Sequence, residues 1–202
     1  MVSDRERAEA VRRLRERAGT VSASEALRLG IHPRTLYALR DEEVLDQLSR
    51  GVYRLAELPP LRQPDLVAVA KRVPDGVICL LSALAFHELT TQIPHAVYVA
   101  VRKGRAVPRV DYPPVVVFQF SQTAFEAGVE EQRLDGEAVR IYSREKTMAD
   151  CFKFRNRLGL DVALEALRLY RQRGRTDGEA LLRFARVCRV QRVMQPYLEA
   201  LL

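Results

Sequence analysis

The sequence contains no tryptophan, only three cysteines and only four lysines, and each scarcity narrows what the protein can be. Aromatic residues make up 7% of the chain and hydrophobic residues 48%, so Leu, Val and Ala must fill its interior. Cys79, Cys151 and Cys188 are odd in number and far apart, which argues against a disulfide framework or a CxxC metal site. Because each lies among apolar residues, we expect the three thiols to behave as small buried hydrophobic groups.

Long apolar runs are also missing. No stretch approaches the roughly 18 apolar residues that a membrane-spanning helix requires, and residues 1–20 are too charged for a signal peptide. We therefore expect a soluble, cytoplasmic protein in a reducing compartment, without a membrane partner.

Arginine is the residue that the chain has in excess. The 33 cations, 29 of them Arg, outnumber 26 acids and give a formal net charge of +7. A basic balance favours polyanionic partners, above all nucleic acid, and the guanidinium is a good planar fork for phosphate and guanine. Codon bias in a GC-rich genome is the alternative cause. Residues 1–60 hold 11 Arg and 10 acids, so a DNA-binding surface there has to be local.

Residues 1–58 have the pattern of a winged helix-turn-helix domain. Apolar residues at helical spacing predict a helix over 5–19, and Ser22 with Glu25 predicts a capping box at the start of a second helix. Gly30 can end that helix and Pro33 can begin a third, which makes the turn between them short.

A hairpin with a basic tip is expected at residues 49–51, where Ser-Arg-Gly would form the wing. A generic three-helix bundle is the alternative, but the polar outer side of the third helix favours a DNA reader. The base-reading candidates are Arg34, Thr35 and Tyr37. The phosphate candidates are Arg40, Arg50 and Arg54, and His32 is expected to cap the helix or contact phosphate.

The rest of the chain predicts a second, mixed domain over residues 65–202, after a proline-punctuated linker at 59–64. Two Val-rich runs, AVYVAV and PVVVFQF, read as strands, and Asp135-Gly136 is a strong hairpin signal. The chain should end in helices over 145–157, 161–173, 178–188 and 191–201. The expected fold class is therefore α+β, with an N-terminal winged helix-turn-helix and a mixed C-terminal domain that ends in several helices.

No pattern of catalytic residues is found, so we expect no enzyme, no cofactor and no metal site. Ser82 and His87 lie five residues apart on one predicted helix, about 140° apart around it, so they should not meet. His87 is expected to be a buried or interfacial ring. The acid-x-Lys pattern of one nuclease class, the Walker loop and a nucleotidyltransferase motif are all missing from the sequence.

The segment SREKTMADCFKFRNRLGLD, residues 143–161, is the richest in charged and reactive side chains. Helical spacing places Met148, Cys151 and Phe152 on an inner side. Thr147 is expected to cap the helix with Asp150 reaching back to it. The predicted surface positions are Lys146, Lys153, Arg155 and Arg157.

The chain resembles the AbiEi antitoxins of type IV toxin–antitoxin systems over nearly its whole length. The matching stretches are SRGVYRL, DGVICLLSALAFHELT, VRIYSREKTMADCFKFRNRLGLD and ALEALRLY. The resemblance implies an N-terminal domain that binds an inverted-repeat operator and represses its own operon. It also implies a C-terminal domain that neutralises a nucleotidyltransferase toxin, for which the candidates are Lys146, Asp150, Lys153, Arg155 and Arg157. The alternatives are a stand-alone regulator with a ligand-sensing C-terminal domain, and an enzyme with a DNA-targeting domain.

Overall fold

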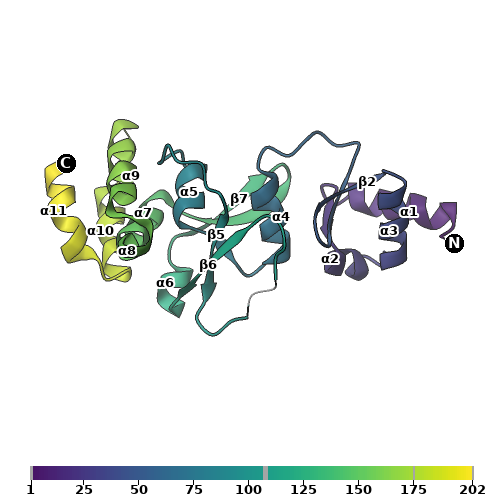
Figure 1. Ribbon diagram of the computed structural model, residues 1–202, viewed down its shortest axis with the longest axis horizontal. Helices are drawn as coiled ribbons and strands as arrows, with labels where there is room; N and C mark the ends of the chain where they lie inside the picture. The colour runs from purple at the N-terminus through teal and green to yellow at the C-terminus, as the bar shows by residue number, and fades with distance from the viewer. Residues whose placement is uncertain (1, 107–108, 175, 202) are drawn as a thin grey trace. The chain divides into compact units, whose positions relative to one another are not determined.

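A computed structural model describes residues 2–106, 109–174 and 176–201 (Figure 1). Contacts between Cα atoms divide the chain into two units. The first unit comprises Met1–Pro74 with the segments Pro108–Pro114 and Arg133–Val139. The second unit comprises Asp75–Val107, Val115–Gln132 and Arg140–Leu202. The boundary expected at residues 59–64 stays a prediction.

The first unit is built from four helices and a small sheet. In chain order its elements are α1 (Asp4–Arg15), β1 (Thr20–Ser22), α2 (Ala23–Arg28), α3 (Pro33–Asp41), β2 (Leu45–Ser49), β3 (Val52–Leu55) and α4 (Pro64–Arg72). The expected hairpin is confirmed, but β1 adds a third strand that was not predicted, and the antiparallel order β1-β3-β2 makes β3 the central strand. The core of this unit contains Leu14, Leu36 and Leu39, one from α1 and two from α3.

Local signals set these boundaries. Glu25 accepts a hydrogen bond from the Ser22 backbone N–H at 2.8 Å, and Ser22 Oγ accepts one from the Glu25 N–H at 3.2 Å, which confirms the capping box. The first helix ends at Arg15, earlier than expected, and the chain then turns through Ala18 with a φ of 59°.

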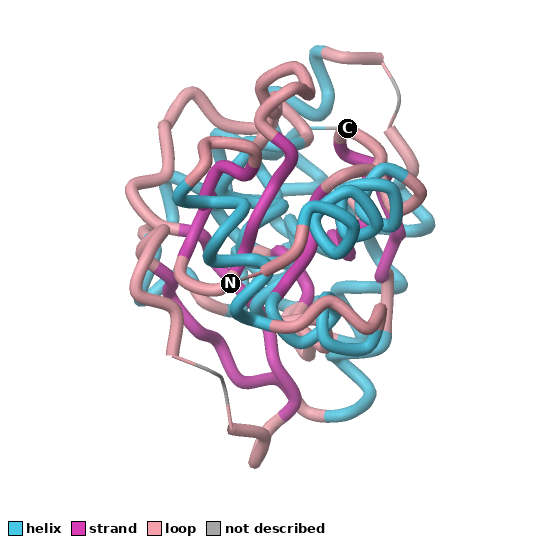
Figure 2. Tube along the Cα trace, turned by 90° about the vertical axis from the view of Figure 1, so that its right-hand side faces the viewer, coloured by secondary structure: helices cyan, strands magenta, loops and turns pink. Residues whose placement is uncertain are grey.

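The second unit combines a five-stranded sheet with a cluster of helices. Its elements are β4 (Val77–Ile78), α5 (Leu80–Phe86), β5 (Val97–Arg102), β6 (Val115–Phe120), α6 (Gln122–Glu126), β7 (Val129–Leu134), β8 (Glu137–Tyr142), α7 (Arg144–Lys153), α8 (Arg155–Leu158), α9 (Leu160–Gln172), α10 (Gly178–Val187) and α11 (Gln191–Leu201), except that residues 133–139, at the hairpin end of β7 and β8, are grouped with the first unit. The strand order is β6-β5-β4-β8-β7, and β5 and β6 run parallel. Figure 2 shows both strands (magenta) and helices (cyan), and after β8 only helices follow, in agreement with the expected α+β class.

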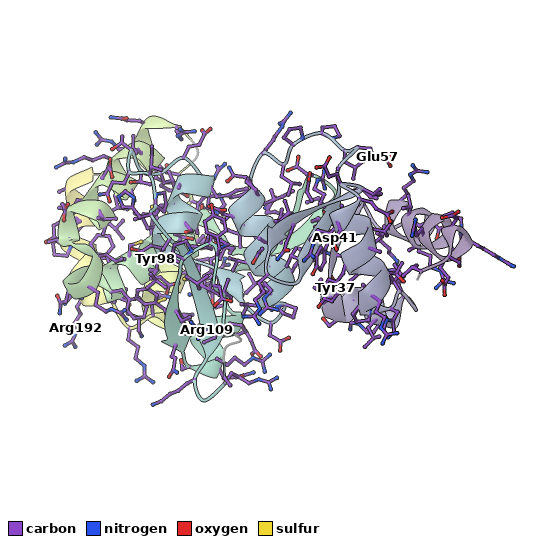
Figure 3. The ribbon with its side chains drawn as sticks, turned by 45° about the vertical axis from the view of Figure 1, so that its right-hand side comes forward. Tyr37, Asp41, Glu57, Tyr98, Arg109 and Arg192 are labelled. Atoms are coloured by element: carbon purple, nitrogen blue, oxygen red, sulfur yellow. The ribbon has the colours of Figure 1, made fainter. Side chains whose placement is uncertain are left out.

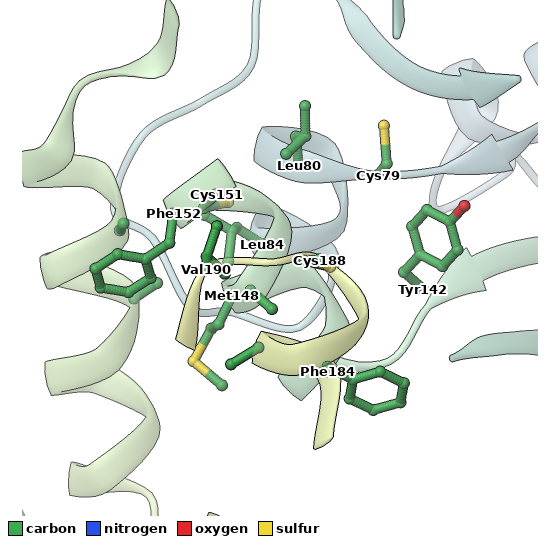
Figure 4. Close-up of a cluster of buried hydrophobic side chains, with 14 of the residues drawn as sticks. Cys79, Leu80, Leu84, Tyr142, Met148, Cys151, Phe152, Phe184, Cys188 and Val190 are labelled. Atoms are coloured by element: carbon green, nitrogen blue, oxygen red, sulfur yellow. The ribbon is translucent and has the colours of Figure 1, made fainter. Parts of the chain in front are cut away.

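Helix α7 is the centre of the helical cluster, with α5, α9, α10 and α11 packed against it (Figure 1). Figure 4 shows Met148, Cys151 and Phe152 of α7 among side chains from the other elements of this core. All three are fully buried, which confirms the predicted inner side. Every residue from Lys146 to Phe152 is buried, so α7 has no solvent-facing side over that stretch.

Candidate functional site

The turn between α2 and α3 is as short as the sequence predicts. Gly30 has a φ of 73°, and the Ile31 N–H donates to the Ala26 carbonyl at 2.9 Å, which closes the end of α2. His32 is the N-cap of α3, and its ring Nδ1 accepts a hydrogen bond from the Arg34 N–H at 3.1 Å. Pro33 follows as the first helical residue. This arrangement orients α3 by covalent and hydrogen-bond constraints within a few residues.

Helix α3 exposes part of the predicted reading surface. Arg34 is exposed, and the Tyr37 side chain is the large exposed aromatic of this helix, at 48% exposure. The Arg40 guanidinium lies 5.4 Å from the centre of the Tyr37 ring and is paired with Asp41 at 2.7 Å. Figure 3 labels Tyr37 and Asp41 on this helix. The ring and the two arginines therefore form a polar surface on one element.

Thr35, expected on the outer side of the helix as a base-reading candidate, is buried, so the expected outward position was wrong. Thr35 is four residues before Leu39 and adjacent to Leu36, so helical geometry turns it toward the core.

The wing tip is the Arg50-Gly51 turn between β2 and β3. The Arg50 side chain is 81% exposed, and its guanidinium lies 3.4 Å from the Asp111 carboxylate. Arg54, expected as a phosphate contact, does not share this exposure, and its burial leaves it no surface from which to reach a phosphate in this structure. It is buried in β3, where it donates to Thr20 Oγ1 at 2.8 Å and to the Pro59 carbonyl at 3.0 Å. The reason is the third strand, which covers β3 on the side that a two-stranded wing would leave open.

The segment of residues 143–161 contains a buried ion pair. Lys146 Nζ lies 2.5 Å from Asp150 Oδ2, and neither side chain is exposed. The Cys188 thiol donates to the other carboxylate oxygen at 3.1 Å, and the Lys146 ammonium sits 4.0 Å from the centre of the Tyr142 ring. Burial raises the pKa of the Asp150 carboxyl, and the Lys146 ammonium opposes that shift. A buried pair of this kind is costly to break, because either partner left alone is an uncompensated charge.

Two of the predicted toxin-neutralisation residues therefore lack the exposure that contact requires. Lys146 was expected at the surface and is buried, and Asp150 is buried as its partner. Thr147 does not cap the helix either. The N-cap is Ser143, whose Oγ accepts from the Lys146 N–H, while the Thr147 hydroxyl donates to the Tyr142 carbonyl at 3.3 Å.

The remaining candidates of this segment do reach the surface. Lys153 and Arg157 are exposed, and Arg155 is half-buried. The expected single helix over 145–157 is interrupted at Phe154, so Arg155 and Arg157 belong to the short helix α8. The Arg157 guanidinium stacks 4.1 Å from the centre of the Phe118 ring, and Lys153 Nζ donates to the Cys188 carbonyl at 3.2 Å.

Ser82 and His87 have separate structural partners. Ser82 Oγ accepts from the Tyr98 N–H at 2.9 Å, and His87 Nε2 lies 2.7 Å from the Tyr142 carbonyl oxygen. His87 is buried, as predicted, and burial lowers its pKa. Among the residues that the structure describes, no group of three or more His, Cys, Asp or Glu could hold a metal ion. Over the same residues, no helix is long and apolar enough to cross a membrane.

Comparison with known proteins connects this geometry to one family. Residues 9–56 match the family model described as "Transcriptional regulator, AbiEi antitoxin". The matched segment runs from within α1 to just past β3, and so includes α2, α3 and the wing. The search of curated proteins found no match to the chain. The match agrees with the resemblance seen in the sequence, and over residues 9–56 the chain is similar to transcriptional regulators of the AbiEi antitoxin family.

Proposed function

We propose that the protein is an antitoxin that represses its own operon by binding an inverted-repeat operator and that neutralises a nucleotidyltransferase-like toxin. One observation carries the DNA-binding half: Arg34 and Tyr37 are exposed on α3, within the segment that matches AbiEi regulators. Helix α3 has nine residues, which at about 1.5 Å per residue span ~14 Å, enough to lie in the major groove. Arg50 at the wing tip then contacts the phosphate backbone beside it.

The residues divide into two roles in this proposal. Arg34 and Tyr37 read base edges, with Arg34 suited to the paired acceptors of guanine. His32, Arg40 and Arg50 lie near phosphates and fix the register without reading sequence. Thr35 and Arg54 hold the domain together and have no direct contact with DNA.

The test is a titration of labelled DNA from upstream of the protein's own gene, beside a scrambled duplex. Replacing Arg34 with Ala should cost about 1–3 kcal/mol of operator binding and relax sequence preference at one base pair. Arg50→Ala should weaken binding to both duplexes alike. Arg192→Ala is the matched control, because it removes one exposed cation from α11. Operator affinity that is unchanged in both Arg34→Ala and Arg50→Ala would refute the assignment.

For toxin neutralisation we propose the surface formed by Lys153, Arg155 and Arg157. Unlike Lys146 and Asp150, these three candidates are not fully buried. Their positive charges suit an acidic surface on a partner protein. Reversing Lys153 and Arg155 together to Glu should weaken protection of cells from the co-expressed toxin. Lys153 is exposed and Arg155 half-buried, and each donates one hydrogen bond to a backbone carbonyl, so the melting temperature is measured beside protection for every variant.

The control for this experiment is the double reversal of Arg186 and Arg192, two exposed cations outside the segment, which changes the net charge by the same amount. If the Lys153 and Arg155 variant stays folded and protects fully, this surface has no part in neutralisation. If protection falls only in step with the melting temperature, the effect is structural.

We also propose that the protein is not an enzyme, because its nucleophile and base candidates are held apart by backbone partners. Transfer of label from labelled ATP to the toxin would overturn this statement. The alternative function, a stand-alone regulator that senses a ligand, would draw on the cavity of about 460 Å³ in the second unit. That cavity is lined by charged groups such as Glu88, Glu145 and Arg173, and a small molecule that shifts operator affinity would favour it.

A further inference from the structure

Strands β5 and β6 belong to the second unit, but part of the segment between them is grouped with the first unit. The two strands are parallel neighbours, so they cannot be joined by a tight turn. Within their connection, the segment Arg109–Tyr112 is grouped with the first unit, together with the wing.

Three hydrogen bonds fix this segment in the first unit. The Ser49 hydroxyl, at the end of β2, donates to the Tyr112 carbonyl at 2.5 Å. Arg72 of α4 donates to the Arg109 carbonyl at 2.9 Å. The third bond joins Arg50 of the wing tip to the Asp111 carboxylate, across a sequence separation of 61 residues. Two of these bonds use backbone carbonyls, so the path of the segment does not depend on its own side chains.

The side chains of the segment face solvent and continue the charge of the wing. Asp111 binds Arg50 through one carboxylate oxygen at 3.4 Å and Arg109 through the other at 3.0 Å. The Arg109 side chain is 93% exposed and that of Arg50 is 81% exposed. One carboxylate thus holds two solvent-facing guanidinium groups side by side, with a net charge of +1. A guanidinium carries five N–H donors, and this contact uses only part of them.

Tyr112 adds a polar group to the same surface. Its side chain is 59% exposed, although it is a large aromatic residue. Exposed arginines and tyrosine hydroxyls are common donors to DNA phosphates, and arginine binds phosphate through two parallel hydrogen bonds. Figure 3 labels Arg109, together with Tyr37 of the proposed reading helix.

We propose that Arg109 and Tyr112 form a second backbone-contacting segment beside the wing, so that two stretches far apart in the sequence hold the DNA phosphates. This inference rests on the proposed operator binding. It assigns to DNA contact a segment that lies outside the family match at residues 9–56. The contact is to the backbone, so it strengthens binding to any sequence and leaves base preference to α3.

The expected effect follows from counterion release. Each phosphate contact contributes about 0.9 to the slope of log affinity against log salt concentration. Near 0.1 M salt one contact is therefore worth ~8-fold in affinity, and its effect shrinks toward none at 1 M. Arg109→Ala should lose that factor on the operator and on a scrambled duplex alike, and should lower the slope by about 0.9. Arg109→Lys keeps the charge and should keep the slope.

Three proteins are compared with the wild type in this titration: Arg109→Ala, Arg50→Ala and the control Arg192→Ala. If the wild type does not prefer its operator, the proposed function fails. If the wild type does and Arg50→Ala lowers the slope, but Arg109→Ala behaves like Arg192→Ala, this inference alone fails. A loss in Arg109→Ala that is confined to the operator would also overturn it, because the residue would then read sequence.

Discussion

Replacing Lys146 with Met should destabilise the second unit strongly, because it leaves the Asp150 carboxylate buried without its counter-ion. Methionine keeps most of the aliphatic stem, so little volume is lost. Among the hydrogen bonds of the described residues, Asp150 has one other side-chain partner, the thiol of Cys188. A thiol is a weak hydrogen-bond donor. Removing one partner of a buried ion pair costs about 3–5 kcal/mol. We expect a loss of this size in the free energy of unfolding at pH 8.

The loss should depend on pH in a defined direction. Burial raises the pKa of Asp150 in the folded state, and without Lys146 nothing of comparable strength opposes that shift. A carboxyl whose pKa is raised on folding stabilises the fold at low pH, and that stabilisation is lost as the pH rises through the folded-state pKa. Below that pKa the variant should regain about 1.4 kcal/mol for each unit of pH, down to the unfolded-state value of about 3.9. The gap to the wild type should therefore be smaller at pH 5 than at pH 8.

The assay is urea unfolding followed by far-ultraviolet circular dichroism at both pH values. Lys153→Met is the matched control, since it removes an exposed lysine from the same helix, and it should cost under about 1 kcal/mol. Adding Asp150→Leu to Lys146→Met should recover stability at pH 8, because the uncompensated charge is gone. The reasoning is refuted if Lys146→Met is as stable as Lys153→Met at pH 8, or if its loss is the same at both pH values.

Two further predictions concern the second unit. Gly128 has a φ of 69°, and a methyl group added there would lie 2.7 Å from Lys146 Cβ. Gly128→Ala should therefore lower the melting temperature more than Gly104→Ala, whose added methyl group meets no described atom within 4 Å. Equal losses in the two variants would show that only backbone strain matters. Hydrogen bonds from Thr91 lower the pKa of Glu165, so Glu165 should stabilise the fold above the unfolded-state pKa of about 4.3 and lose this effect as the pH falls through the folded-state value. The melting temperatures of wild type and Glu165→Gln should then converge between pH 6 and pH 3, and a constant gap would contradict the assignment.

The residues that end one helix and begin the next predicted the helix-turn-helix well. Gly30 and Pro33 act through backbone conformation alone, so their effect does not depend on distant residues. The Asp135-Gly136 hairpin is a similar case, since both residues have the positive φ that such a turn needs. The exposure of Arg34 follows from the positions of Leu36 and Leu39 on the same helix.

Burial that depends on distant elements could not be predicted in this way. Strand β1 has only three residues, Thr20–Ser22, too few for an alternating pattern to reveal it, so the burial of Arg54 had no local signal. Helical periodicity gives α7 one inner side, whereas four other helices cover it from several directions and bury Lys146 and Asp150 as well. The spacing of four residues between a lysine and an acid suits an ion pair on any helix, but it does not say whether that pair is in water.

Because all three cysteines are buried, their reactivity can be used to measure the unfolding of the second unit. Cys79, Cys151 and Cys188 are free and buried, and all belong to the second unit. Burial raises the pKa of each thiol, so an alkylating reagent should react only when the structure opens. A chain without tryptophan offers no indole fluorescence for the same purpose. Thiol trapping follows the opening of the second unit alone, while circular dichroism follows both, so the difference between the two transitions measures whether the first unit melts independently.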